Sequence, residues 1–179
     1  MAAMHSSPAD RTRLQAFERL LRAQGFPTNL VLAGDGVPYD VLLAGLSDEE
    51  GKRQWQLELS FVPGMEEDLE GLSLLQCFVH LPVDAAAEAE DELRRLIVRL
   101  NARMPVMGFG WLEAERMACF RHTAMLPRDE EAAGEVVVQL AWMADYLLGV
   151  FAPTIEAVAT GARTSDQAIA ENVFREVFE

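Results

Sequence analysis

The chain has few cysteines and few basic residues for its length. Of 179 residues, only 2 are cysteine and 15 are lysine or arginine, against 29 aspartate and glutamate, so the formal net charge is -14. Two thiols cannot build a disulfide framework, and an acidic protein repels nucleic acid and anionic lipid. The opening residues, MAAMHSSPADRTR, lack a basic segment followed by an apolar one and a cleavage site. We expect a cytoplasmic protein that binds neither nucleic acid nor membranes.

Recognisable catalytic and cofactor motifs are also missing. The sequence has no G-x-S-x-G elbow, no HExxH pair and no P-loop. The stretch GFGW at 108–111 continues with Leu112 and Glu113, where a dinucleotide fingerprint needs another glycine, and we interpret it as the entrance to a strand. The acidic loop at 64–71 lacks the alternating pattern of a calcium loop. We therefore expect a protein that is not an enzyme and holds no cofactor or metal.

Two cysteine–histidine pairs are the remaining candidates for chemistry. His80 follows Cys77 by three residues, and His122 follows Cys119 by three. On a strand an odd spacing places two side chains on opposite faces, so neither pair chelates one metal by itself. A site that combines one residue from each pair across two strands stays open. So does a small-molecule-binding or hydrolytic enzyme that uses His80 or His122 with nearby carboxylates.

What the chain does have is a long apolar segment, GEVVVQLAWMADYLLGVFAP at 134–153. A membrane-spanning helix needs about 20 mainly apolar residues, whereas this segment contains Gln139 and Asp145 and no lysine or arginine cluster flanks it. We interpret it as the core helix of a soluble domain, with a kink or break because Pro153 cannot bond to the carbonyl of Gly149. Its spacing predicts a core stripe of Val136, Leu140, Met143, Leu147, Val150, Thr154 and Val158, widened by Val137, Ala141, Ala144, Leu148 and Phe151.

Shorter patterns predict the other elements. An amphipathic helix is expected at 10–24, with an N-cap within 8–10 and with Leu14, Phe17, Leu20 and Leu21 on its apolar face. Two short strands broken at 34–36 are expected within 29–46, an alternating strand within 53–63 and a further strand within 72–82. A second amphipathic helix is expected at 84–104, followed by a hairpin that turns near 114–115. After Gly161, a short last helix is expected to be capped by Ser165 or Asp166.

This order of elements predicts an α+β fold. We expect a single antiparallel sheet with helices packed on one face, in the order α-β(3-4)-α-ββ-α, plus a short C-terminal helix. The expected organisation is a disordered N-terminus at 1–9, one domain at 10–161 and a helical tail at 162–179.

The second half resembles a known family, and the expected N-terminal helix and the strands after it fit the same order of elements, so the resemblance covers about residues 10–160. LIVRLNARMPVMGFGWLEAERMACFRHTAMLPRDEEAAGEVVVQLAWMADYLLGVFAPTIEAVATG, at 96–161, is similar to YbjN-like bacterial proteins and, through them, to the type III secretion chaperone-like fold. The resemblance implies a small acidic protein, often a homodimer, that holds partially folded protein segments or acts as an adaptor. It brings no catalytic residues with it. The acidic insertion at 64–71 and the tail after Gly161 depart from the compact secretion chaperones.

The leading hypothesis is a non-catalytic protein that binds another polypeptide through an apolar groove or a sheet edge. The long helix is apolar on nearly all sides, so a second layer must bury the side that does not face the sheet. That layer could be a bound client polypeptide, a second subunit, or the C-terminal segment with Ile169, Val173 and Phe174. Two-fold pairing is the commonest symmetry, so we expect a homodimer. The expected interface residues are Val138, Trp142, Asp145, Tyr146 and Phe151. A structural dimer within a larger assembly is a further alternative.

Overall fold

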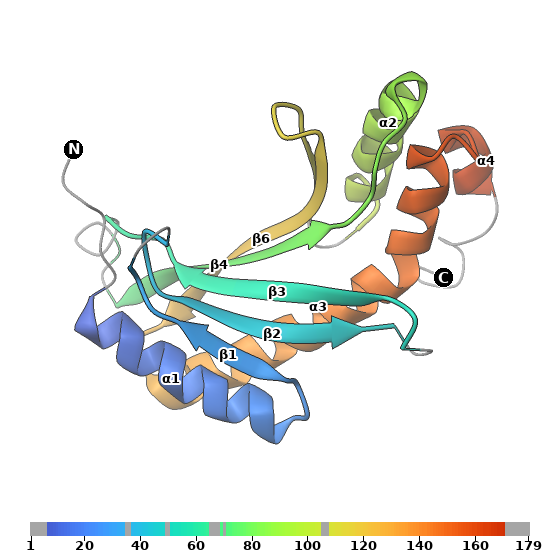
Figure 1. Ribbon diagram of the computed structural model, residues 1–179. Coiled ribbons are helices and arrows are strands. Elements are labelled where there is room, and N and C mark those ends of the chain that lie inside the picture. Colours follow the sequence, from blue (N-terminus) through green and yellow to red (C-terminus); the bar gives the residue numbers. More distant parts are fainter. Residues whose placement is uncertain are drawn as a thin grey trace. The chain divides into compact units, whose positions relative to one another are not determined.

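The computed structural model describes residues 7–34, 37–48, 51–64, 69, 71–104 and 108–170 (Figure 1). The predicted α+β class and order of elements are confirmed. The elements are α1 (Pro8–Ala23), β1 (Thr28–Val31), β2 (Val41–Ser47), β3 (Gln54–Phe61), β4 (Leu72–Leu81), η1 (Ala87–Ala89), α2 (Glu90–Asn101), β5 (Phe109–Leu112), β6 (Met117–Pro127), α3 (Glu130–Ala159) and α4 (Ser165–Ala170). Within the described residues, the strands form one antiparallel sheet in the order β1-β2-β3-β4-β6-β5.

The chain divides into two compact units. The first contains Met1–Val79 and His122–Asp145, and the second contains His80–Arg121 and Tyr146–Glu179. The boundaries fall within β4, β6 and α3, so neither unit is continuous in sequence.

In the first unit, strand alternation gathers apolar side chains on one face of the sheet. Leu42 of β2, Leu59 of β3 and Cys77 of β4 are aligned across the strands, and all three are buried. Side chains two residues apart along a strand share its face, so this face is apolar along its length. α1 and the first part of α3 pack against it (Figure 1), with the ring of Phe17 6.2 Å from that of Phe61.

The start of α1 is fixed by a capping box. The hydroxyl of Ser7 accepts a hydrogen bond from the amide of Asp10 at 3.1 Å, and the Asp10 carboxylate accepts one from the amide of Ser7 at 3.3 Å. The N-cap is therefore Ser7, which corrects the expected cap within 8–10, and the helix begins at Pro8. Proline suits this position because the first helical amides have no partner within the helix.

α3 runs unbroken from Glu130 to Ala159, so of the kink or break expected near Pro153 the break is wrong. Pro153 removes a single hydrogen bond, to the carbonyl of Gly149, and the space beside Gly149 is open. By length and hydropathy α3 is long and apolar enough to cross a membrane, and 44% of its most apolar window is buried inside the fold.

The second unit has a centre of three phenylalanine rings. The ring of Phe109 meets those of Phe120 and Phe151 edge-on, with centroids 5.6 and 5.9 Å apart. Gly108 leaves the room that the Phe120 ring occupies, because a Cβ there would collide with it, and this confirms the interpretation of GFGW as a strand entrance. At the end of α2, the side-chain amide of Asn101 donates to the Phe109 carbonyl at 2.7 Å and accepts from the Phe109 amide at 3.1 Å.

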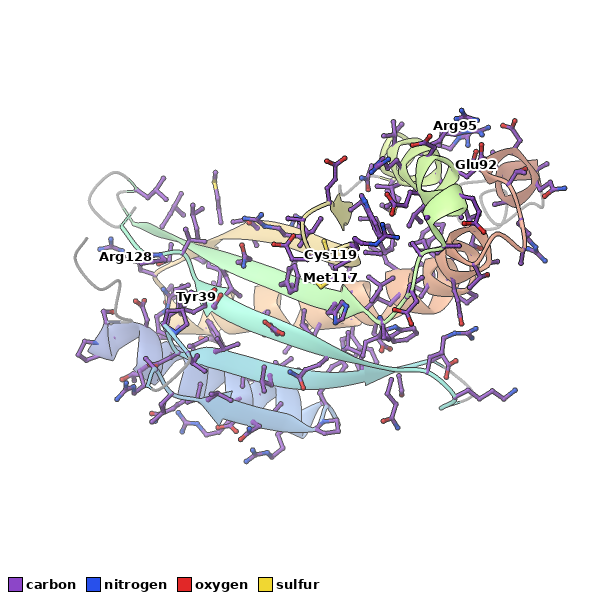
Figure 2. All side chains as sticks on the ribbon, turned by 45° about the horizontal axis from the view of Figure 1, so that its top comes forward. Tyr39, Glu92, Arg95, Met117, Cys119 and Arg128 are labelled. Atoms are coloured by element: carbon purple, nitrogen blue, oxygen red, sulfur yellow. The ribbon has the colours of Figure 1, made fainter. Side chains whose placement is uncertain are left out.

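α4 is capped by Thr164, which corrects the expected cap at Ser165 or Asp166. The Thr164 hydroxyl accepts from the amide of Gln167 at 3.2 Å, and the Gln167 side chain accepts from the amide of Thr164 at 2.9 Å. Ser165 is buried instead, and both its amide and its hydroxyl donate to the Glu92 carboxylate at 2.7 Å. These bonds hold the pKa of Glu92 below its usual value. Figure 2 shows Glu92 on α2, on the side toward α4.

Candidate functional site

The outer side of α3 carries apolar residues that the sequence assigned to the core. Val136 is exposed, and Leu140 and Met143 are half-buried. This part of the predicted core stripe is wrong, because two adjacent stripes of α3 are apolar and a helical period does not say which one faces the sheet. The buried face of α3 in the first unit is centred on Val137, Ala141 and Ala144.

These residues line a groove on the first unit with a volume of about 950 Å³. We call it the α1–α3 groove. Leu20, predicted as a core residue of α1, is 41% exposed and forms part of its wall. The lining carries two carboxylates and no lysine or arginine. Its residues are Leu20 of α1, Gln24 at the C-cap of α1, and Glu131, Gly134, Glu135, Val136, Val138, Gln139, Leu140 and Met143 from α3.

The position of α1 beside the groove depends on a buried cation, Arg13. Its guanidinium donates to the hydroxyl of Ser73 at 2.7 Å and to the carbonyl of Pro127 at 2.8 Å, and it lies 4.7 Å from the ring centre of Phe61. Burial lowers the pKa of Arg13. The contact joins α1 to β3, β4 and the end of β6. The sequence did not predict this buried arginine, because an arginine in an amphipathic helix is normally expected on the surface.

Trp142, an expected interface residue, already has a partner within the chain. Its ring lies on that of Phe26, with centroids 4.7 Å apart and planes tilted by 57°. Phe26 is buried, whereas Trp142 keeps 45% of its surface exposed. One face of the indole is therefore covered without a second subunit, which weakens the original reason for expecting a dimer there.

The other four expected interface residues lie in different surroundings. Val138 lines the α1–α3 groove, and Asp145 accepts a hydrogen bond from the amide of Ser47 at 3.2 Å. Tyr146, the first α3 residue of the second unit, is 54% exposed. Phe151 is fully buried against Phe109 and presents no surface to a partner. Ile169 is half-buried on α4, and the expected covering residues at 173 and 174 lie outside the described residues.

Asp145 of α3 has a raised pKa. Partial burial raises its pKa, and the hydrogen bond from the Ser47 amide opposes that rise. The bond links α3 to the end of β2. Asp145 therefore acts as a connection within the first unit as well as a polar surface group.

β1 forms one edge of the sheet. The amide of Gly45 in β2 donates to the carbonyl of Pro27, and hydrogen-bonded pairs alternate along an antiparallel ladder. The backbone groups of Thr28 and Leu30 therefore point away from β2. The edge has four residues, and the side chain of Arg22 donates to the Thr28 carbonyl at 3.4 Å. Short edge strands are a common protection against pairing with other chains.

The thiols and histidines are not gathered into a reactive centre. Cys77 is buried on β4, which raises its pKa to about 12, and burial also raises the pKa of Cys119 on β6 (Figure 2). Thiols with raised pKa values are poor nucleophiles because little thiolate forms. His80 is exposed while Cys77 is buried, as strand parity predicts. Among the residues that the structure describes, no group of three or more His, Cys, Asp or Glu side chains could hold a metal ion.

Comparison with known proteins returned no match to any family model, any curated protein or any solved structure. The assignment of the candidate site therefore rests on the structure of this chain. Sequence reasoning identified Val138 but missed Leu20, Val136 and Met143 as surface residues. The available signal was the excess of apolar residues around α3, which showed that one stripe must lie outside the core.

Proposed function

We propose that this chain is a non-catalytic adaptor or chaperone-like protein that binds a segment of another polypeptide in the α1–α3 groove. The groove itself is the observation that supports the proposal. It brings exposed Leu20 and Val136 together with half-buried Leu140 and Met143 on an otherwise acidic molecule. Contiguous exposed apolar surface rimmed by polar residues marks interaction sites.

The groove is a better candidate than the β1 edge of the sheet. An extended partner would find only the outward groups of Thr28 and Leu30 on β1, and one of their carbonyls already contacts Arg22. The groove offers side-chain contacts over a much larger surface, and burial of each large apolar side chain contributes roughly 1.5–3 kcal/mol. We therefore assign the binding role to the groove.

The homodimer expected from the sequence is less favoured by the same geometry. Phe26 covers one face of Trp142, and Phe151 belongs to the centre of the second unit. We propose a complex between one copy of this chain and a different polypeptide, in the cytoplasm. The resemblance to YbjN-like and secretion chaperone-like proteins supports a polypeptide-binding role on sequence grounds.

A hydrolytic or small-molecule-binding enzyme is the competing class. It would have to use His80 or His122, and in the described part of the chain neither histidine has a hydrogen bond or ion pair with a carboxylate. The two thiols have raised pKa values and lie buried. These observations give the catalytic alternative no support.

Affinity capture from lysate with matched variants tests the proposal. Met143→Glu places a charge in the groove, whereas Met125→Glu places the same charge on β6, where Met125 is 64% exposed. We expect one discrete polypeptide to be captured by the parent and by Met125→Glu, and to be lost with Met143→Glu. Capture that does not depend on Met143 would overturn the proposal. So would a bound metabolite whose turnover disappears in His80→Ala or His122→Ala.

A further inference from the structure

We infer that the segment bound in the α1–α3 groove is an amphipathic helix with a basic polar face. This inference rests on the proposed function and specifies the class of partner. Three features of the first unit support it: the charge of the groove, the way its walls are built, and its length.

The charge of the groove points to a basic partner. Its lining includes Glu131 and Glu135, both exposed, and no lysine or arginine. The whole chain carries a net charge of -14, and the carboxylates of the lining lie on the α3 wall, whereas the arginines of α1 lie outside the lining. Lysine or arginine beside the apolar stripe of a partner would meet these carboxylates at the rim. Complementary charge of this kind raises the association rate and rejects acidic partners.

The walls of the groove favour a helix over an extended strand. Both walls are helices, α1 and α3, whose backbone amides and carbonyls are largely bonded within each helix. An extended segment would find few backbone partners there and would leave its own polar groups unpaired. A helix satisfies its backbone internally and offers only side chains. Val136, Leu140 and Met143 recur at spacings of four and three, which is the pattern that receives the ridge of another helix.

The length of the groove sets the length of the partner. The lining along α3 extends from Glu131 to Met143, which is about 18 Å at 1.5 Å per residue. A partner helix of about three to four turns would cover it. A second copy of this chain fits less well, because its own groove lining has no lysine or arginine that could pair with Glu131 and Glu135.

The test uses the full chain and two fluorescein-labelled helical peptides of about 14 residues. Both carry leucine at i, i+3, i+4 and i+7 spacing, with lysine at the polar positions of one and glutamate at those of the other. We expect the lysine peptide to bind at least tenfold more tightly by fluorescence anisotropy and to become helical when bound. Equal affinity for the two peptides would overturn the inference and leave a polypeptide-binding groove intact.

Matched charge reversals separate a local site from diffuse attraction to an acidic protein. Glu131→Lys with Glu135→Lys changes the groove, whereas Glu88→Lys with Glu115→Lys makes the same change in net charge at two exposed residues elsewhere. We expect the first pair to weaken lysine-peptide binding more than tenfold and the second less than threefold. Equal losses would overturn the inference, because binding would then follow net charge alone.

Two further measurements guard against misfolding and self-association. Met143→Gln should weaken the lysine peptide several-fold while Met125→Gln leaves it unchanged, with circular dichroism confirming that both variants are folded. Light scattering should show a monomeric parent at micromolar concentration. A parent dimer that Met143→Glu dissociates would assign the groove to a second copy and overturn the inference.

Discussion

Leu20 of α1 lies directly over Gly134 of α3: a Cβ added at position 134 would come within 2.5 Å of Cδ1 of Leu20. Gly134 is buried, and Leu20 is half-exposed at the wall of the α1–α3 groove. Because glycine has no side chain, α1 and α3 can approach each other closely at this position. This close approach sets the position of the α1 wall of the groove.

This contact predicts different effects for two glycine substitutions in the same helix. Alanine is favoured over glycine in a helix by about 0.8–1 kcal/mol. Gly149 has open space beside it, so Gly149→Ala should raise the free energy of unfolding by about that amount. In Gly134→Ala the same gain is offset, because Leu20 must move. Urea unfolding of both variants checks the difference, and an equal gain at the two positions would contradict the contact.

The Gly134→Ala variant should also narrow the groove without unfolding the protein. The colliding atom, Cδ1 of Leu20, is at the far end of a flexible side chain, so Leu20 can rotate away from the added methyl group. This rotation moves the Leu20 side chain, which forms part of the groove wall. We expect weaker binding of the lysine peptide to Gly134→Ala and unchanged binding to Gly149→Ala. Fluorescence anisotropy on the two variants measures this.

Trp142 and Phe26 should be energetically coupled. Their rings are in contact at 4.7 Å, and aromatic pairs contribute about 0.5–1.5 kcal/mol beyond the area they bury. Trp142→Ala should lower the free energy of unfolding by about 1–2 kcal/mol, since the ring is only half-buried. A double-mutant cycle with Phe26→Ala should return a coupling in the range given for aromatic pairs.

Tyr146→Ala is the control for that cycle, because Tyr146 is exposed and has no aromatic partner in the described part of the chain. It should change stability by less than about 0.5 kcal/mol and show no coupling to Phe26→Ala. A negligible Trp142–Phe26 coupling would mean that the ring is not covered within the chain, and would restore the dimer interface.

Asp145 and Asp48, both in the first unit, should contribute to the free energy of unfolding with opposite dependence on pH. The folded pKa of Asp145 is raised by burial, so near and above the ordinary aspartate pKa of about 3.9 the unfolded state holds fewer protons than the folded one. The contribution of Asp145 to stability therefore falls as pH rises through this window. Asp145→Asn should be more stable than the parent at pH 7, with the difference vanishing at pH 3.

Asp48 is the counterpart. Hydrogen bonds from the amides of Arg53 and Lys52 lower its pKa, so its contribution to stability is present above the ordinary aspartate pKa and is lost as pH falls through the folded value. Asp48→Asn should be less stable than the parent at pH 7 and equal to it in acid. Urea midpoints measured between pH 3 and pH 7 decide both cases, and parallel curves for the two variants would contradict the assignment.

Much of the fold could be predicted from local pattern. Alternation of apolar residues on β3 indicates a half-buried strand, and the short turns between the strands favour antiparallel pairing over parallel pairing, which needs long crossovers. The caps were harder: Ser7 and Thr164 were missed because several polar residues stand near each helix start, and only the backbone geometry selects one.

The groove could not be predicted because it depends on which side of α3 meets the sheet. Val136 and Val137 are adjacent in sequence and chemically identical, yet Val136 is exposed and Val137 is fully buried. Val137 shares its buried face with Ala141 and Ala144, whose small side chains suit close packing of α3. Contacts between distant segments, such as Leu20 with Gly134, leave no periodic signal in the sequence.

The central claim is that the α1–α3 groove binds a polypeptide, and site-specific photo-crosslinking tests it most directly. A benzophenone amino acid placed at Val136 or Met143 samples the groove, while the same group at Val98 of α2 or Met125 of β6 samples exposed apolar positions elsewhere. We predict a discrete polypeptide adduct from both groove positions and from neither control position. Adducts that form equally at all four positions, or at Val98 and Met125 alone, would contradict the account.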